Sequence, residues 1–147
     1  DIEKMIGEIY NDLFYLENVD KIDFKIEVDK GLTFNSDEKR VNVILKNLIF
    51  NAVKYQNLNQ ENPSIKVKAN EDGNHILISV KDNGEGIDPD IQEKVYEMFF
   101  RASEKSSGSG LGLYIVKEMV GKLDGTIQLK SEPDKGSEFI IRLPSMA

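Results

Sequence analysis

Three stretches of the chain carry apolar residues at three- and four-residue spacing, the period of a helix with one buried face. These residues are Ile2, Ile6, Ile9, Leu13 and Leu16 in the first stretch, Val41, Leu45, Leu48, Ile49 and Ala52 in the second, and Leu113, Ile115, Val116, Met119 and Val120 in the third. Cap-type and acidic residues at 35–38 precede the second stretch, where the free amides of a helix start need acceptors. The pattern predicts helices over residues 2–16, 37–56 and 111–122.

Other stretches alternate apolar and polar residues, as strands with one covered face do. They cover residues 24–28, 65–70, 76–81, 127–130 and 138–143. Turn-forming residues at 71–74 and 133–136 predict two antiparallel hairpins. Asp88 and Pro89 are typical of a helix start and predict a short helix that ends near Met98. Together these elements predict an α/β fold, a two-layer sandwich in which helices cover one face of a mixed, mostly antiparallel sheet.

Composition narrows the possible functions. A length of 147 residues fits one domain, residues 1–147, and the start at Asp1 inside a helical pattern leads us to expect a piece of a longer protein. The absence of cysteine excludes disulfides and thiol nucleophiles and fits a reducing, cytoplasmic setting. A net charge of −7 argues against a nucleic-acid partner. No apolar run approaches the roughly 20 residues that cross a bilayer, so we expect no direct membrane contact.

The long central helix carries polar residues beside its apolar face. At about 100° per residue, Asn47, Asn51 and Lys54 form one stripe, with Tyr55 at its border. A solvated face explains such a stripe, but asparagine is a mediocre helix former. An amide oxygen of Asn51 suits Mg²⁺, and Lys54 would bring a positive charge to phosphates. Tyr55 could form an aromatic wall for a base.

Two glycine-containing segments follow along the chain. Asp82 ends an apolar strand and precedes Gly84 and Gly86, which permit positive φ and close approach of a ligand. A carboxylate fixed there can accept a hydrogen bond from an exocyclic amine and so select adenine over guanine. An ordinary turn explains the same residues, whereas a calcium loop would need oxygen side chains at the two glycine positions.

The second segment, residues 108–113, reads Gly-Ser-Gly-Leu-Gly-Leu and opens a predicted helix. A helix start offers free amides to an anion, so the segment favours phosphate binding over a flexible linker. Its spacing fits neither a dinucleotide fold nor a Walker loop.

In this order the segments resemble the ATP-binding domain of two-component histidine kinases, in the superfamily of gyrase, MutL and the large heat-shock chaperone. Residues 47–55 are similar to the asparagine box of that family, 82–86 to its first glycine box, 99–101 to its phenylalanine box and 108–113 to its second glycine box. The resemblance covers nearly the whole chain and implies the Bergerat-type ATP-binding fold. Met98 departs from the proline often found at that position in the phenylalanine box.

The resemblance also implies roles for single residues. Asn51 would hold Mg²⁺, Asp82 would accept from the adenine amine, and Lys54 would contact the phosphates of ATP. Residues 101–110 would form a flexible lid, with Arg101 and Lys105 closing over the γ-phosphate. Residues 136–139 are similar to the closing strand motif of the family, in which the hydroxyl residue, here Ser137, would support the adenine-binding Asp82. The full set of implied nucleotide-binding residues is Asn47, Asn51, Lys54, Tyr55, Asp82, Gly84, Gly86, Ile87, Phe99, Ser109, Gly110, Leu111, Gly112, Leu113 and Ser137.

Asn47 bears on which reaction the pocket supports. Hydrolytic members of the superfamily carry a glutamate four residues before the metal-binding asparagine, and so do serine kinases of the anti-sigma type. An amide cannot accept a proton from water, so Asn47 disfavours hydrolysis. Asn47 and Arg101 are the candidate catalytic residues.

The phosphoryl acceptor is expected outside this sequence. The single histidine, His75, lies at a predicted turn and is not followed by the residues of a phosphoacceptor helix. The resemblance therefore implies a histidine protein kinase that transfers phosphate from Mg-ATP to a helical phosphoacceptor domain of the same kinase, and onward to a response regulator receiver domain. The alternatives are an ATP-binding interaction module without kinase activity, or an ATPase of the MutL or gyrase type.

Overall fold

The computed structural model describes residues 1–16, 19–32, 36–56, 60–98 and 112–145. Five strands form one sheet in the order β1-β2-β3-β5-β4. The strands are β1 (Asp23–Val28), β2 (Ser64–Asp72), β3 (His75–Asp82), β4 (Thr126–Glu132) and β5 (Gly136–Pro144). β1 is parallel to β2, and the other neighbours are antiparallel. The predicted mixed, mostly antiparallel sheet is confirmed.

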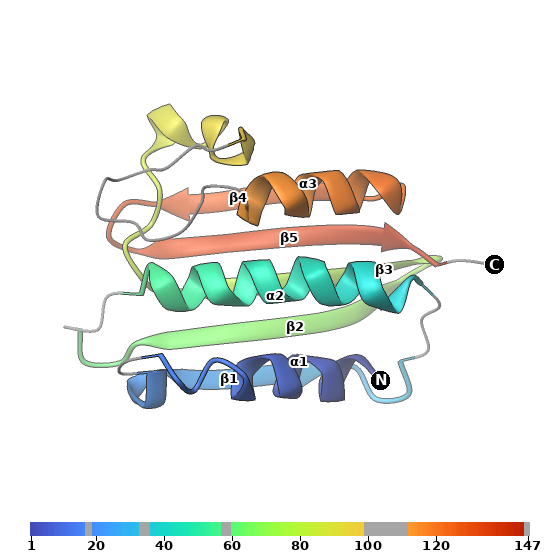
Figure 1. Cartoon of the computed structure of the whole chain (residues 1–147), viewed down its shortest axis with the longest axis horizontal. Helices are drawn as coiled ribbons and strands as arrows, with labels where there is room; N and C mark the ends of the chain where they lie inside the picture. The colour runs from blue at the N-terminus through green and yellow to red at the C-terminus, as the bar shows by residue number, and fades with distance from the viewer. Residues whose placement is uncertain (17–18, 33–35, 57–59, 99–111, 146–147) are drawn as a thin grey trace.

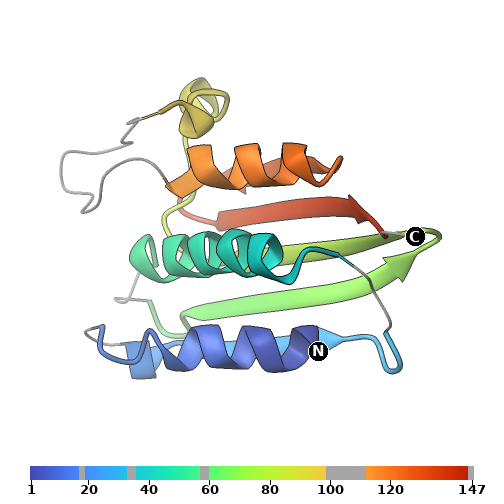
Figure 2. The ribbon, with the colours of Figure 1, turned by 45° about the vertical axis from the view of Figure 1, so that its right-hand side comes forward.

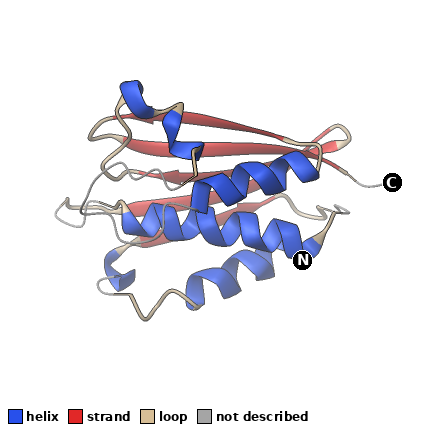
Figure 3. Cartoon of the chain, turned by 45° about the horizontal axis from the view of Figure 1, so that its top comes forward, coloured by secondary structure: helices blue, strands red, loops and turns tan. Residues whose placement is uncertain are grey.

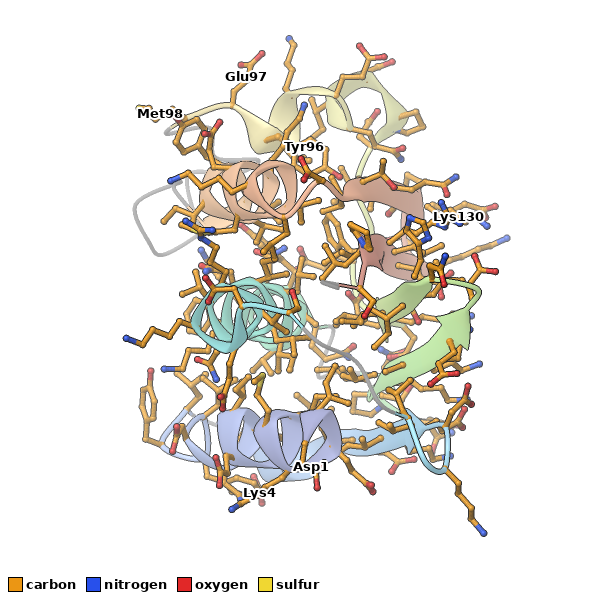
Figure 4. The ribbon with its side chains drawn as sticks, turned by 90° about the vertical axis from the view of Figure 1, so that its right-hand side faces the viewer. Asp1, Lys4, Tyr96, Glu97, Met98 and Lys130 are labelled. Atoms are coloured by element: carbon orange, nitrogen blue, oxygen red, sulfur yellow. The ribbon has the colours of Figure 1, made fainter. Side chains whose placement is uncertain are left out.

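In the described part of the chain, three α-helices cover one face of this sheet (Figure 1). They are α1 (Ile2–Asn11), α2 (Glu38–Lys54) and α3 (Gly112–Lys122). Seen from the side, the helices lie in one layer and the strands in the other (Figure 4), and a tilted view shows the same two layers (Figure 3). The core fills the space between them. Alternate residues along most of β2 and β3 point into this core, for example Ile65, Val67 and Ile78, each at most 1% exposed. The two-layer sandwich follows from that alternation.

The long helix α2 begins where its sequence predicts. Asp37 caps it by accepting a hydrogen bond from the backbone amide of Arg40 at 3.1 Å. Its buried residues are Val41, Ile44, Leu45, Leu48, Ile49 and Ala52. This stripe packs the helix over the middle of the sheet, beside α3 (Figure 2).

Two helix predictions are wrong in their extent. The first helix ends at Asn11 rather than at residue 16, and bonds between residues three apart, such as Leu13 to Tyr10, continue the chain as turns. Leu13 remains buried because such turns keep it on the core side. Residues 88–98 form two 3₁₀ turns, η2 (Pro89–Ile91) and η3 (Lys94–Tyr96), instead of one helix. Between them these turns bury only Val95 fully, too little apolar surface to stabilise a continuous helix.

The C-terminal end of α3 is fixed by backbone geometry. Asp124 adopts a positive φ of 59°, and the amide of Gly125 donates to the carbonyl of Val120 at 2.9 Å. This is the hydrogen-bond pattern of a Schellman ending. A Cβ on Gly125 would lie 2.5 Å from Cδ2 of Leu143, so glycine is required there because β5 lies so close.

Candidate nucleotide site

Four chain segments meet at one end of the molecule. The last turn of α2, the first turn of α3, the end of β3 and the start of β5 all lie there (Figure 1). The antiparallel register brings Asp82, the last residue of β3, opposite Ser137 of β5. Six of the predicted nucleotide-binding residues are located on these segments, so the sheet and helices bring together what the sequence separates: Asn51, Lys54, Asp82, Gly112, Leu113 and Ser137.

Asn47 lies against the start of α3. Its side-chain amide Nδ2 donates to the carbonyl of Val43 at 2.8 Å, one turn back in the same helix. A Cβ built on Gly112 would be 3.2 Å from Oδ1 of Asn47. The carbonyl end of Asn47 therefore faces the first residue of α3, where a side chain larger than hydrogen would press on it. Gly112 and Leu113 are both half-buried at this contact.

Asn51 and Lys54 continue the polar edge of α2, and both are half-buried. The Lys54 ammonium lies 5.2 Å from the ring centroid of Tyr55, a distance at which a cation is attracted to the face of a ring. Tyr55 is also half-buried, and its carbonyl accepts a hydrogen bond from the amide of Glu85 at 3.0 Å. The end of α2 is thus attached to the first glycine segment.

Asp82 is the most enclosed charged group of the site, with 8% of its surface exposed. Its Oδ1 accepts hydrogen bonds from the amide of Gly84 at 2.9 Å and from the amide of Ser137 at 3.3 Å. Burial raises the pKa of Asp82 from 3.8 to about 6, because loss of solvent disfavours the charged form, and these two amides oppose the rise. Among the described residues Oδ2 accepts no hydrogen bond, and it is not one of their fully buried unpaired polar atoms.

The two predicted glycines of this segment are required by close contacts. A Cβ on Gly84 would collide with the carbonyl oxygen of Tyr55, and one on Gly86 with the carbonyl oxygen of Glu132. Gly86 also has a φ of 72°, which side-chain-bearing residues rarely adopt. Ile87, the next residue, donates its amide to Oγ of Ser131 at 2.8 Å.

Ser137 contacts Asp82 through its backbone amide and not through its hydroxyl. The hydroxyl oxygen lies 2.8 Å from Oγ of Ser131. The reason is the strand alternation: the cross-strand position opposite Asp82 presents the Ser137 amide to the carboxylate, and the hydroxyl turns to the neighbouring strand β4. Ser137 therefore supports Asp82 through its main chain.

Several predicted residues lie outside the described part of the chain. They are Phe99, Arg101, Lys105, Ser109, Gly110 and Leu111, together with the lid predicted over residues 101–110. Their roles stay predictions.

The oxygen atoms available at the site suit a Mg²⁺ ion that enters together with a phosphate-bearing ligand. Among the described residues no group of three or more His, Asp and Glu side chains could hold a metal ion by itself. Asn51 offers a single amide oxygen on the polar edge of α2. Mg²⁺ takes one or two protein oxygens and completes its shell with water and phosphate, so Asn51 fits such an ion.

Four polar residues of the site were missed by the sequence interpretation. Gln60 donates through Nε2 to the backbone carbonyl of Asn83 at 2.7 Å, and Asn83 in turn accepts at Oδ1 from the amide of Ser64 at 2.8 Å. On the other side, Ser131 and Gln92 contact Ile87. Only Asn83 carried a signal, because it lies inside the Asp-Asn-Gly motif. Gln60 and Ser131 contact the segment across 23 and 44 positions of the chain, whereas Gln92 lies five residues after Ile87.

Comparison with known proteins decides the family. Residues 36–147 match the family described as "Histidine kinase-, DNA gyrase B-, and HSP90-like ATPase". The chain belongs to this family. The resemblance and the fold predicted from the sequence are confirmed, and the matched domain is the ATP-binding catalytic domain of histidine kinases.

Individual relatives agree with the family. The chain is 34% identical to the sensor-like histidine kinase SenX3 of Mycobacterium tuberculosis over 99% of its own length and 36% of the relative. It is 32% identical to the sensor histidine kinase RcsC of Escherichia coli K12 over 81% of its length and 12% of the relative. The chain thus spans about a third or less of the length of these curated relatives.

Solved structures share the fold along the whole chain. The mycobacterial sensor histidine kinase MprB superposes with a TM-score of 0.80 at 25% identity, covering 99% of this chain and 95% of that one. Full-length ShkA, solved in complex with AMPPNP, superposes with a TM-score of 0.84 at 29% identity, covering 100% of this chain and 31% of that one. The described helices include none that is long and apolar enough to cross a membrane.

Proposed function

We propose that this domain binds Mg-ATP at the end of the sheet formed by α2, β3, α3 and β5, and donates the γ-phosphoryl group to a histidine. The acceptor histidine would lie on a helical phosphoacceptor domain of the same kinase, and a response regulator receiver domain would take the group from it. We place this reaction in the cytoplasm, where ATP is available. Support comes from the family and from relatives named as sensor histidine kinases.

The observation that carries the proposal is the environment of Asp82. One carboxylate oxygen is held by two backbone amides, and the other accepts nothing from the described residues. A buried carboxylate with one oxygen fixed and one available can accept a hydrogen bond from the exocyclic amine of adenine. Guanine carries a carbonyl oxygen at that position. This oxygen and the carboxylate oxygen are both acceptors, so they cannot form a hydrogen bond and would repel each other. We therefore expect selection of ATP over GTP.

The phosphates would extend from Asp82 toward the start of α3. Gly112 and Leu113 begin this helix, whose free amides and positive dipole end favour an anion. Lys54 adds a cation on α2, and Ser109, Gly110 and Leu111 stay the predicted remainder of the cradle. Asn51 would hold Mg²⁺, which neutralises phosphate charge when bound.

The reaction would be a direct phosphoryl transfer. A ring nitrogen of the acceptor histidine attacks the γ-phosphorus, the bond from that phosphorus to the bridging oxygen breaks, and ADP leaves with the electron pair. The chain contributes mainly positioning and charge neutralisation. Asn47 makes water a poor competitor, because its amide cannot take a proton. Arg101 remains the predicted partner of the γ-phosphate.

Phosphoryl transfer to the helical domain of the parent kinase tests the proposal. Labelled ATP should transfer label to the acceptor histidine, and Asp82→Asn should abolish both this transfer and ATP binding in calorimetry. Asp72→Asn is the matched control, because Asp72 is an exposed aspartate at the opposite end of the hairpin, paired with Arg142 at 3.2 Å.

Other results would contradict the proposal in different ways. ATP binding without label transfer would support an interaction module. Rapid phosphate release without an acceptor would support an ATPase of the MutL or gyrase type and remove the argument from Asn47.

A further inference from the structure

The Ser131 hydroxyl connects Ile87, just after the first glycine segment, with the start of β5 beside the candidate site. Its oxygen accepts from the amide of Ile87 at 2.8 Å and donates to the carbonyl of Gly136 at 2.9 Å. It also lies 2.8 Å from Oγ of Ser137. We call Ser131, Ser137, Ile87 and Gly136 the serine clasp.

The direction of each hydrogen bond follows from counting protons. The Ser131 hydroxyl has one hydrogen, and the carbonyl of Gly136 can only accept, so that hydrogen is used there. The amide of Ile87 can only donate. The hydroxyl of Ser137 must then donate to Ser131, which accepts two hydrogen bonds and donates one. The clasp is fully satisfied, and no apolar side chain could replace its centre.

A second side chain strengthens the same connection. Nε2 of Gln92 donates to the carbonyl of Ile87 at 2.9 Å and to the carbonyl of Ser131 at 3.1 Å. Both polar backbone groups of Ile87 are therefore held, one by the Ser131 hydroxyl and one by Gln92. The amide of Asp134 holds the carbonyl of Glu85 at 2.7 Å on the same side. The end of the first glycine segment is thus tied to the β4–β5 hairpin.

Two residues of the serine clasp, Ser137 and Gly136, also lie against Asp82. Ser137 donates its hydroxyl to Ser131 and its amide to Oδ1 of Asp82. Gly136 approaches Asp82 so closely that a Cβ on Gly136 would collide with the Asp82 carbonyl oxygen. Ile87 lies at the other end of the segment that Asp82 begins. Ser131 therefore fixes both the strand that orients the carboxylate and the loop that leads away from it.

We propose that Ser131 is a positioning residue for nucleotide binding, which keeps the first glycine segment and the Ser137 amide in the arrangement that aims Asp82 at adenine. It does so without touching the nucleotide. This inference rests on the proposed function, since it takes Asp82 as the adenine acceptor. Ser131 lies outside both glycine segments, so the motifs themselves assign it no role.

Three substitutions test it by calorimetry with ADP. Ser131→Ala removes all three hydroxyl contacts, and ADP affinity should fall about tenfold, the change expected when one or two hydrogen bonds are lost. Ser131→Thr keeps the hydroxyl on a strand that accepts β-branched residues, and affinity should return to within about threefold. Tyr10→Phe is the control, because it removes a buried hydroxyl bond to the Val19 carbonyl at 3.1 Å outside the site.

The control separates positioning from general destabilisation. Ser131→Ala and Tyr10→Phe should both lower the melting temperature, but only the first should change ADP affinity. An unchanged affinity in Ser131→Ala, or an equal loss in Tyr10→Phe, would overturn the inference. Titration of the Asp82 carboxyl carbon by NMR gives a second readout, in which Ser131→Ala should raise the pKa of Asp82 because the Ser137 amide is no longer held in place.

The two proposals can fail separately. If the unaltered chain binds no adenine nucleotide, the proposed function fails, and the carboxyl titration alone decides whether Ser131 orients Asp82. If ADP binds and Ser131→Ala leaves the ADP affinity unchanged, only the role of Ser131 is rejected.

Discussion

The backbone amide of Ser137 donates a hydrogen bond to Oδ1 of Asp82 at 3.3 Å, across 55 positions of the chain. The antiparallel pairing of β3 with β5 creates this contact. It leaves a buried carboxylate with one oxygen engaged, while the other accepts no hydrogen bond from the described residues. The stability and the binding behaviour of the domain both depend on this carboxylate.

The stability of the nucleotide-free domain should depend on the ionisation of Asp82. The pKa of Asp82 is about 6 in the folded state and 3.8 as the ordinary value, so the folded state binds the proton more tightly. Ionised Asp82 therefore destabilises the fold above pH 6, and this cost disappears as the pH falls toward 4. Asp82→Asn should be more stable than the unaltered chain at pH 7, and the difference should shrink by about 1 kcal/mol at pH 5. Urea unfolding at both pH values measures this difference in the free energy of unfolding. A difference that does not change with pH would contradict the prediction.

Adenine binding should weaken in acid for the same reason. Only ionised Asp82 accepts a hydrogen bond at both oxygens, so affinity should fall toward tenfold for each pH unit below about 6. Adenosine is the appropriate ligand, because the phosphates of ATP titrate in the same range. NMR titration of adenosine between pH 5 and 7.5 measures the effect. A flat profile would mean that Asp82 does not face the base.

Substitution of Gly86 should be far more costly than substitution of Gly73. Both glycines have positive φ, 72° and 62°, but a Cβ on Gly86 collides with the Glu132 carbonyl whereas Gly73 has no atom within 4 Å. Gly73→Ala should cost about 1 kcal/mol from backbone strain alone. Gly86→Ala should cost several kcal/mol, since the β4–β5 hairpin must also move. Thermal unfolding of the two variants compares them, and equal losses would refute the contact.

Two tyrosine-to-phenylalanine changes should have opposite effects on stability. The Tyr96 hydroxyl is buried without a partner among the described residues, and its burial raises the pKa of Tyr96 to about 12. Tyr96→Phe should therefore stabilise the fold by about 1 kcal/mol, because an unpaired buried hydroxyl is lost. Tyr10→Phe should destabilise it by a similar amount, because the Tyr10 hydroxyl donates to the Val19 carbonyl. Chemical unfolding of both variants checks the signs, and a destabilised Tyr96→Phe would reveal a partner for that hydroxyl.

The sequence by itself determined the elements that depend on neighbouring residues. The stripe of Val41, Leu45, Leu48 and Ile49 defined α2, and strand alternation with turn residues defined both hairpins. The asparagines of α2 and the glycines of residues 82–86 marked the candidate site. These signals are local, because helix period, strand alternation and permitted φ values are properties of a few consecutive residues.

Only the tertiary structure decided how these elements meet. No local pattern pairs β3 with β5 or sets β1 parallel to β2, because strand order is fixed by packing across the whole core. The Ser137 amide on Asp82, the Ser131 hydroxyl on Ile87 and the raised pKa of Asp82 all follow from that packing. The sequence placed an aspartate before two glycines, and burial between β3 and β5 turned it into a carboxylate that is costly to ionise and ready to accept one hydrogen bond.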